Sequence, residues 1–334
     1  MSDKRIPYIS FLQIIGPVYV ILGHSINGIN ITGWWYVFSK EWIYIFHMPL
    51  FFFISGYLLS FRGYLKGHTY KEFILGKTMR LLVPYLFWNL LFYVPKVMAQ
   101  AYISESVPSK FYDMLKIFVF PRQNVWGHTW FLVGLFVIYA MAPVFAKILT
   151  TKRMFINVVI IAICIVIYIL PITTEFLALS DLHKDLLFFV IGCMLGQMSK
   201  DVFVYRLKKL RFVLIIFAVI TSVITLLWYN YTKILHFIPC TCILLAFLSI
   251  AVGIKIMPKT FEKLAKNSFA IYILHWPVMI VARVILYQIL NLGAIETVIA
   301  MSVLGWMVPI LVVESIRKLP WVKFKKPLTY LIGV

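Results

Sequence analysis

Long apolar runs are the feature that most constrains this chain. Each is about long enough for a helix to cross the ~30 Å hydrocarbon core of a bilayer. Only 13% of the residues are charged, whereas soluble domains average about a quarter. Because a helix satisfies its own backbone inside a bilayer, the runs predict an all-α, polytopic membrane protein with about ten transmembrane helices. The runs are centred on residues 8–26, 42–60, 81–100, 129–147, 154–171, 184–199, 212–229, 237–254, 269–290 and 297–316.

The chain shows no internal repeat of 20–50 residues and no low-complexity linker, so we predict a single domain over residues 1–334. All four cysteines, Cys164, Cys193, Cys240 and Cys242, fall inside apolar runs. That placement favours burial as small hydrophobic side chains over disulfide or metal chemistry. We therefore expect no metal site.

The basic residues are distributed unevenly between the loops. Of the 32 Lys and Arg residues, 24 lie at the N-terminus, in alternate loops and after the last run, and six lie in the intervening loops. The side of a membrane that carries the excess of Lys and Arg is normally the cytoplasmic one. We predict that both termini are cytoplasmic. The net charge of +20 then indicates membrane lipids as partners and not nucleic acid.

Ionisable side chains at membrane depth are costly and usually face a protein interior or a wet cavity. In the first run, Gln13 and His24 are eleven residues apart, which on a helix is within roughly 20° of one face and about 16 Å along the axis. We expect them to line one groove at two depths, with His24 near the outer side. A histidine at the lipid headgroup level is the alternative. The predicted outer set is His24, His47, Arg122, His128 and Asp185.

A second polar set is predicted near the cytoplasmic side. Lys77 and Arg80 are one turn apart and could hold phosphate groups or anchor the third run among anionic headgroups. His275 follows the start of the run 269–290 by six residues, about 10 Å above the cytoplasmic end. The inner set is Gln13, Lys77, Arg80, His275 and Glu314. Two such sets suit either a transporter or an enzyme that works across the membrane.

The sixth run carries Gly192 and Gly196 at GxxxG spacing. Small residues at this spacing allow two helix backbones to approach each other closely. We therefore predict a tight helix–helix contact there, with no chemical role.

Six stretches, in this order, resemble acyltransferase family 3. They are YISFLQIIGPVYVILGHS, FHMPLFFFISGYLL, KTMRLLVPYLFW, HTWFLVGLF, NSFAIYILHWPV and VVESIRKLP, and together they extend from Tyr8 to Pro320. The resemblance implies a ten-helix membrane acyltransferase that modifies cell-surface sugars and uses an acyl-CoA donor.

Position by position, His24 matches the catalytic histidine of the family's first helix. The further matches are Arg80 before the third helix, Trp130 and Phe131 in the WFL motif, His275 and Pro277 in the YxxHxP motif, Glu314 as the late glutamate and, loosely, Arg122 before WFL. Two positions depart from the pattern, with Ser10 where the family has aspartate and Gln13 where it has arginine. The resemblance places that arginine at the acyl-CoA donor. Gln13 can hydrogen-bond there but cannot neutralise a phosphate.

The residues and the resemblance together predict an O-acyltransferase, specifically an O-acetyltransferase, in a bacterial plasma membrane. The donor would be cytoplasmic acyl-CoA, with acetyl-CoA as the expected form. The acceptor would be a hydroxyl of a cell-surface or lipid-linked carbohydrate. His24 would act as general base, since free imidazole has a pKa of about 6.5, with Arg122 and His128 shaping the acceptor cleft and assisting the oxyanion. Gln13, Lys77, Arg80, His275 and Glu314 would serve the donor.

Two other interpretations stay open at this point. One is a transporter of a sugar or a lipid-linked intermediate, in which the histidines relay protons. The other is an inactive family member that has lost donor binding at Gln13.

Overall fold

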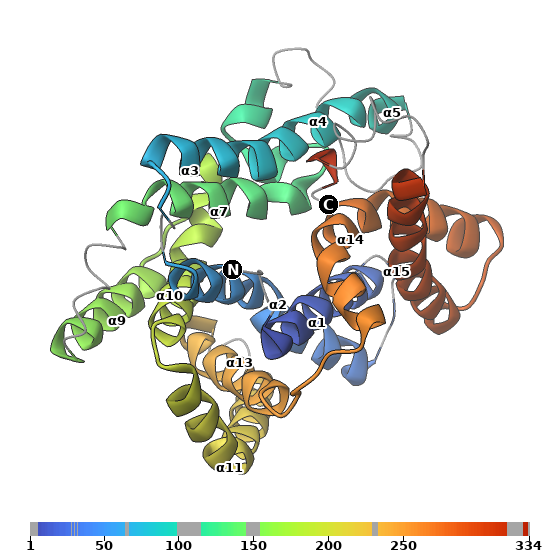
Figure 1. Cartoon of the computed structure of the whole chain (residues 1–334). Coiled ribbons are helices and arrows are strands. Elements are labelled where there is room, and N and C mark those ends of the chain that lie inside the picture. The colour runs from blue at the N-terminus through green and yellow to red at the C-terminus, as the bar shows by residue number, and fades with distance from the viewer. Residues whose placement is uncertain are drawn as a thin grey trace. The chain divides into compact units, whose positions relative to one another are not determined.

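A computed structural model describes residues 6–27, 29, 31, 33–63, 67–98, 115–144, 154–228, 233–318 and 330–332. Helices make up all of the regular structure in these ranges (Figure 1). The α-helices are α1 (Pro7–Asn27), α2 (Trp34–Phe61), α3 (Tyr70–Lys77), α4 (Val83–Leu91), α5 (Tyr93–Met98), α7 (Trp130–Ala140), α9 (Met154–Ile169), α10 (Leu179–Gly196), α11 (Lys200–Leu227), α13 (Phe237–Ala251), α14 (Lys259–Arg283) and α15 (Ala294–Lys318).

Every one of the ten apolar runs contains a helix, which confirms the all-α prediction for the described residues. Six helical segments of the described part of the chain are long and apolar enough to cross a membrane. They are Pro7–Asn27, Trp34–Phe61, Tyr70–Met98, Lys200–Leu227, Lys259–Ile289 and Ala294–Lys318. The count of about ten spans and the cytoplasmic termini stay predictions, and the basic residues in 145–153 and 319–329 lie outside the described residues.

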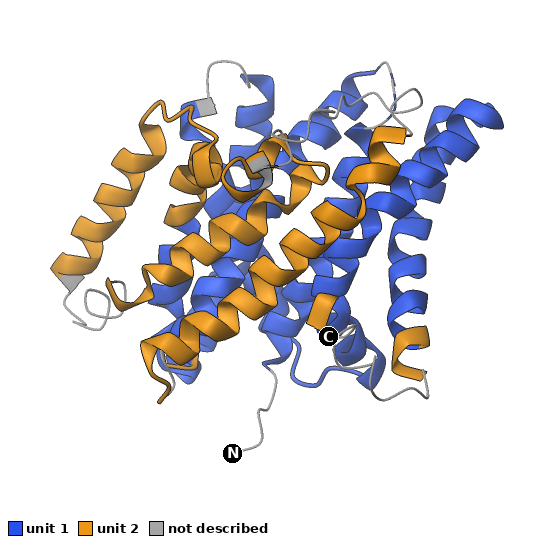
Figure 2. Ribbon diagram, turned by 90° about the horizontal axis from the view of Figure 1, so that it is seen from above, with its two compact units in different colours: residues 1–61, 188–314 blue, residues 62–187, 315–334 orange. Residues whose placement is uncertain are grey.

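The chain divides into two compact units, each built from separate stretches of sequence (Figure 2). Unit 1 comprises residues 1–61 and 188–314, and unit 2 comprises residues 62–187 and 315–334. The boundary between 187 and 188 falls inside α10. The prediction of a single domain stays a prediction.

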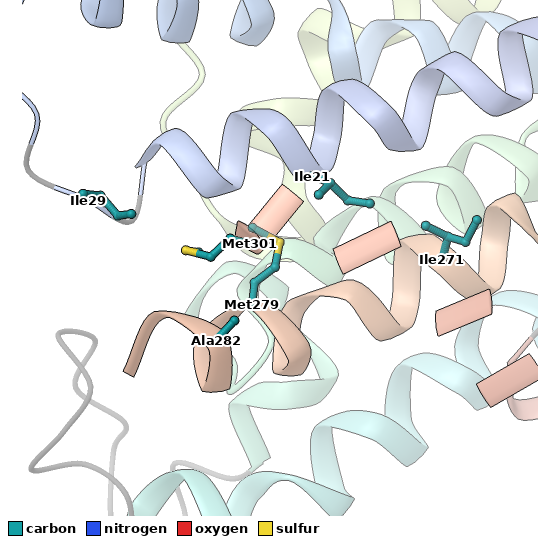
Figure 3. Packing of buried hydrophobic residues seen from close by; sticks show 6 residues of the cluster. All are labelled: Ile21, Ile29, Ile271, Met279, Ala282 and Met301. Carbon is teal, nitrogen blue, oxygen red and sulfur yellow. The ribbon is translucent and has the colours of Figure 1, made fainter. Parts of the chain in front are cut away.

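In unit 1, α1 packs against α2, α13 and α14. A close approach of α1 to α2 needs glycine, because a Cβ atom at Gly16 would lie 2.7 Å from the Phe51 ring. Apolar side chains fill the space where α1, α14 and α15 meet (Figure 3). The buried members of this core are Ile21, Ile29, Ile271, Met279, Ala282 and Met301.

The contact predicted for Gly192 and Gly196 is confirmed, and its partner is α2. A Cβ atom would lie 2.2 Å from the Phe53 carbonyl oxygen if placed on Gly192, and 2.5 Å from that of Tyr57 if placed on Gly196. On the opposite side of the contact, a Cβ atom on Gly56 of α2 would lie 2.0 Å from the carbonyl oxygen of Phe189. Backbone therefore meets backbone along this interface.

In unit 2, α3 and α4 are joined by a single π-helical turn, Thr78–Leu82. The N-terminus of α3 has a capping box in which Thr69 and Glu72 satisfy each other's backbone N–H groups. The Tyr70 hydroxyl donates a 2.7 Å hydrogen bond to the Ala140 carbonyl at the end of α7. The hydrogen bond from Tyr70 joins α3 to α7.

Candidate functional site

His24 lies in the last turn of α1 and faces aromatic side chains from two other helices. Its ring centroid is 5.5 Å from that of His275 and 4.8 Å from that of Trp276, both on α14. The Tyr44 ring of α2 is 6.5 Å from His24 and 4.8 Å from His47. Three helices of unit 1 thus build an imidazole cluster, which we define as His24, Tyr44, His47, His275 and Trp276.

The prediction that His275 belongs with the cytoplasmic set is wrong, because its ring contacts His24. The error comes from where the helix begins. The depth of His275 was counted from residue 269, where the apolar run starts, but α14 already starts at Lys259, ten residues earlier. His275 is therefore sixteen residues, or about 24 Å, from the start of its helix.

Hydrogen bonds set the tautomers of the two buried imidazoles. His275 Nδ1 is 3.2 Å from the carbonyl oxygen of Ile271, and His47 Nδ1 is 3.0 Å from that of Ile43. A carbonyl oxygen can only accept, so each Nδ1 carries the proton and Nε2 is the basic nitrogen. His24 is the one member of the three that is not buried, and it is thus the most accessible to a reactant.

Gln13 occupies the same uninterrupted helix as His24 and is half-buried. Because α1 continues without a break from Pro7 to Asn27, the predicted spacing of the two side chains along one face is retained.

Glu314 forms a 2.7 Å ion pair with Lys263 of α14. Lys263 precedes His275 by twelve residues on the same helix, or about 18 Å. Glu314 is therefore well separated from the imidazole cluster along α14.

Lys77 and Arg80, which the sequence groups as a pair that could hold phosphate groups, have different surroundings in unit 2. The Lys77 Nζ atom is 3.7 Å from the centroid of the Tyr139 ring and 5.1 Å from that of Phe73. This is a cation–π arrangement within the protein. Arg80 lies in the π-helical turn and is exposed. Its guanidinium is the more available of the two cations for a phosphate.

Arg122 is engaged by a carboxylate that the sequence did not single out. Its Nε and Nη2 atoms donate to the two oxygens of Asp181 at 2.8 and 2.5 Å. The guanidinium carbon also lies 4.5 Å from the centroid of the Trp130 ring. A bidentate pair of this kind fixes the arginine strongly, so the expected oxyanion contact would have to use its remaining donor atoms.

His128 precedes α7 and is buried, with its ring centroid 5.7 Å from that of Trp126. The segment that carries it is held by Asn89, which is fully buried in α4. The Asn89 side chain accepts the Trp126 backbone N–H at 3.0 Å and donates to the Thr129 hydroxyl at 3.1 Å. Sequence reasoning missed Asn89, because nothing in a single apolar run marks it as a partner of a distant loop.

A buried lysine supports the same segment. Lys96 lies in α5 and donates from Nζ to the Val125 carbonyl at 2.7 Å. A lysine inside an apolar run indicates that its charge has a partner within the protein, but the sequence does not identify that partner. Together, Asn89 and Lys96 hold the loop that presents Arg122 and His128.

The structure thus brings His24 and His275 together in unit 1, with Gln13 on the same helix as His24. It places Lys77, Arg80, Arg122 and His128 in unit 2. Within the described ranges, no group of three or more His, Cys, Asp or Glu side chains could hold a metal ion.

Comparison with known proteins finds a family match over nearly the whole chain. Residues 6–313 match a family model described as an acyltransferase domain. The chain is 29% identical over 203 residues to Nodulation protein NolL of Sinorhizobium fredii, which covers 60% of this chain and 51% of that protein. It is 30% identical over 183 residues to Nodulation protein NolL of Mesorhizobium japonicum, covering 53% and 44%. The chain spans about half the length of these curated relatives, and no solved structure matches.

Proposed function

This chain belongs to acyltransferase family 3, and we propose on that premise that it is an integral membrane O-acetyltransferase. Its donor is cytoplasmic acyl-CoA, with acetyl-CoA as the expected form. Its acceptor is a hydroxyl of a cell-surface or lipid-linked carbohydrate. The proposal includes about ten membrane spans, cytoplasmic termini and a place in a bacterial plasma membrane.

The contact between His24 and His275 carries the proposal. His24 is the accessible imidazole, and its neighbours His275 and Trp276 restrict the directions in which its ring can turn. Such a ring suits a general base that must meet the proton of an incoming hydroxyl. His275, fixed through Ile271, is a positioning residue for His24 in this mechanism.

In the proposed reaction, the acyl group passes from the sulfur atom of CoA to the oxygen atom of the acceptor hydroxyl. His24 takes the proton of the acceptor hydroxyl while the oxygen attacks the thioester carbonyl carbon. The C–O bond forms, the C–S bond breaks as the tetrahedral intermediate collapses, and the proton taken by His24 passes to the CoA thiolate. In this proposal, Arg122 and His128 shape the cleft for the acceptor and assist the oxyanion of the tetrahedral intermediate.

On the donor side, Arg80 provides the charge for the CoA phosphates, with Lys77 nearby as a second cation. Gln13 occupies the helix face below His24 and offers hydrogen bonds to the donor without neutralising a phosphate. We place Glu314 on the donor side, at the cytoplasmic end, where its ion pair with Lys263 joins α15 to α14.

The test uses the full chain purified in detergent, acetyl-CoA labelled in the acetyl group, and surface glycans extracted from the producing cells. His24→Ala should lower label incorporation by at least about 10²-fold, the scale of general-base catalysis, while the melting temperature stays near that of the wild type. The wild-type rate should fall as the pH is lowered, because only neutral imidazole accepts a proton. His68→Ala is the control, since His68 is an exposed histidine of unit 2 whose ring contact is with Glu72.

An active His24→Ala protein would refute the general-base mechanism. The same protein reconstituted into lipid vesicles tests the alternative. Flux of unmodified glycan across the vesicle membrane, without incorporation of label, would identify the chain as a transporter of glycan and not as an enzyme.

A further inference from the structure

The turn that leads into α10 has an unfavourable backbone conformation. Leu177 has φ 49° and ψ 29°, and Ala178 has φ 61°. Residues that carry a Cβ atom rarely adopt this left-handed region, where glycine is the usual residue. Tertiary contacts must therefore hold the turn in this conformation, and strain of this kind is concentrated at functional sites.

Two hydrogen bonds join this part of the chain to the segment that carries Arg122. The Leu177 backbone N–H donates to the Val119 carbonyl at 2.7 Å. The Gln123 side chain donates from Nε2 to the Glu175 carboxylate at 2.8 Å. The strained turn is thus fixed against residues on both sides of Arg122.

The same turn leads directly to Asp181, the partner of Arg122. Asp181 lies in the first turn of α10, and its two oxygens accept from Nε and Nη2 of Arg122. The Trp130 ring lies 4.5 Å from the guanidinium carbon. A bidentate carboxylate fixes the direction of the planar guanidinium. Because the pair uses Nε and Nη2, the two N–H groups of Nη1 stay outside it.

Stability is a weak explanation for this arrangement. The Arg122 and Asp181 side chains are 39% and 23% exposed, and ion pairs with this much exposure contribute little to the free energy of folding. Orientation is the stronger explanation, since an arginine held in advance can donate to a developing negative charge without reorganising.

We infer that Asp181 is a positioning residue for acyl transfer: the strained turn holds it where it orients Arg122, so that Nη1 donates to the oxyanion of the tetrahedral intermediate. The inference rests on the proposed function, because it needs the role given there to Arg122.

The experiment is a double-mutant cycle on the rate of transfer. Asp181→Asn, Arg122→Gln and the double variant are made in the full chain, with Asp181→Glu as the conservative variant. The kcat and KM values are measured with labelled acetyl-CoA and surface polysaccharide that has been de-O-acylated by mild alkali. Glu175→Gln is the matched control, because it also removes a carboxylate that joins the two segments but does not bind Arg122. Thermal unfolding is measured in the same detergent.

Asp181→Asn should lower kcat by about 10- to 100-fold, the scale of misaligning an oxyanion donor, and leave the KM for acetyl-CoA within about twofold. Asp181→Glu should recover part of this loss, because it keeps the carboxylate. In the Arg122→Gln background, Asp181→Asn should lower kcat by less than about twofold further, because Asp181 acts through Arg122. Glu175→Gln should keep the wild-type kcat, and all melting temperatures should stay close to the wild-type value.

Additive effects of the Asp181 and Arg122 substitutions, or a kcat for Asp181→Asn equal to that of Glu175→Gln, would overturn the inference. If Asp181→Asn does not fold, Asp181→Glu takes its place in the cycle, with the same requirement of non-additivity. Failure of the proposed function is a separate result. A wild-type protein that transfers no label to any extracted glycan would refute the reaction, and a wild-type kcat for Arg122→Gln would refute the oxyanion role of Arg122; either result would also overturn the inference.

Discussion

The interface between α2 and α10 provides a prediction whose size follows from the backbone geometry. In Gly56→Ala, the new methyl group would lie 2.0 Å from the Phe189 carbonyl oxygen, whereas contacts under 3.0 Å are essentially never seen for real Cβ atoms. The two backbones must therefore separate locally by roughly 1 Å or more. Overpacking of this kind costs about 1–3 kcal/mol, and the better helix propensity of alanine offsets up to about 1 kcal/mol. We expect a net loss of roughly 1–2 kcal/mol in the free energy of unfolding.

The assay is thermal unfolding of the purified chain in detergent, followed by tryptophan fluorescence and by circular dichroism. A loss of this size should lower the melting temperature by several degrees in a unit of this size. Gly76→Ala is the matched control, because Gly76 is exposed in α3 and has no atom within 4 Å of an added Cβ. That substitution should raise the stability by up to about 1 kcal/mol through helix propensity alone.

Opposite signs for the two substitutions are the decisive result. If Gly56→Ala were neutral or stabilising, α2 and α10 would not be in backbone contact, and the structural basis of the GxxxG prediction would be refuted. Transfer activity gives a second measure. Since α2 also carries Tyr44 beside His24, Gly56→Ala should reduce the rate as well as the stability.

Two further predictions concern charged side chains. Arg80→Gln should raise the KM for acetyl-CoA by about tenfold or more. Lys77→Gln should raise this KM less and should lower the melting temperature, because the contact between Lys77 and the Tyr139 ring is lost. Equal effects of the two substitutions on the KM would contradict the assignment of Arg80 to the phosphates. For Lys263 and Glu314, whose side chains are 52% and 23% exposed, a double-mutant cycle of unfolding should give a coupling of about 0.2–1 kcal/mol that weakens in salt. A coupling of several kcal/mol, insensitive to salt, would show that this pair is shielded from water.

Sequence reasoning predicted the elements well, because hydrophobic runs and small-residue spacing are local signals. The helix in every apolar run and the close contact at Gly192 and Gly196 are confirmed. It failed where a helix extends beyond its apolar run. The polar turns from Lys259 onward lengthen α14, so a depth counted from the apolar boundary misplaced His275.

The candidate site was predictable only in part for a related reason. A histidine or arginine in an apolar run signals an unusual environment, but its partner is set by tertiary contacts between distant segments. Asp181 pairs with Arg122 across fifty-nine positions, and Asn89 meets Trp126 across thirty-seven. No spacing rule in either segment contains that information.

The π-helical turn at Thr78–Leu82 determines how this region can change in length. A π-turn holds one residue more than an α-turn, and each residue rotates a helix by about 100°. Deleting a single residue here would restore ordinary α-helical winding with little backbone strain. It would also rotate α3 about its axis relative to α4, turning Tyr70 away from Ala140 and Lys77 away from Tyr139. Insertions and deletions should therefore be far less acceptable within these five residues than in the loop before Thr69, even though the turn contains only one buried side chain, that of Leu81.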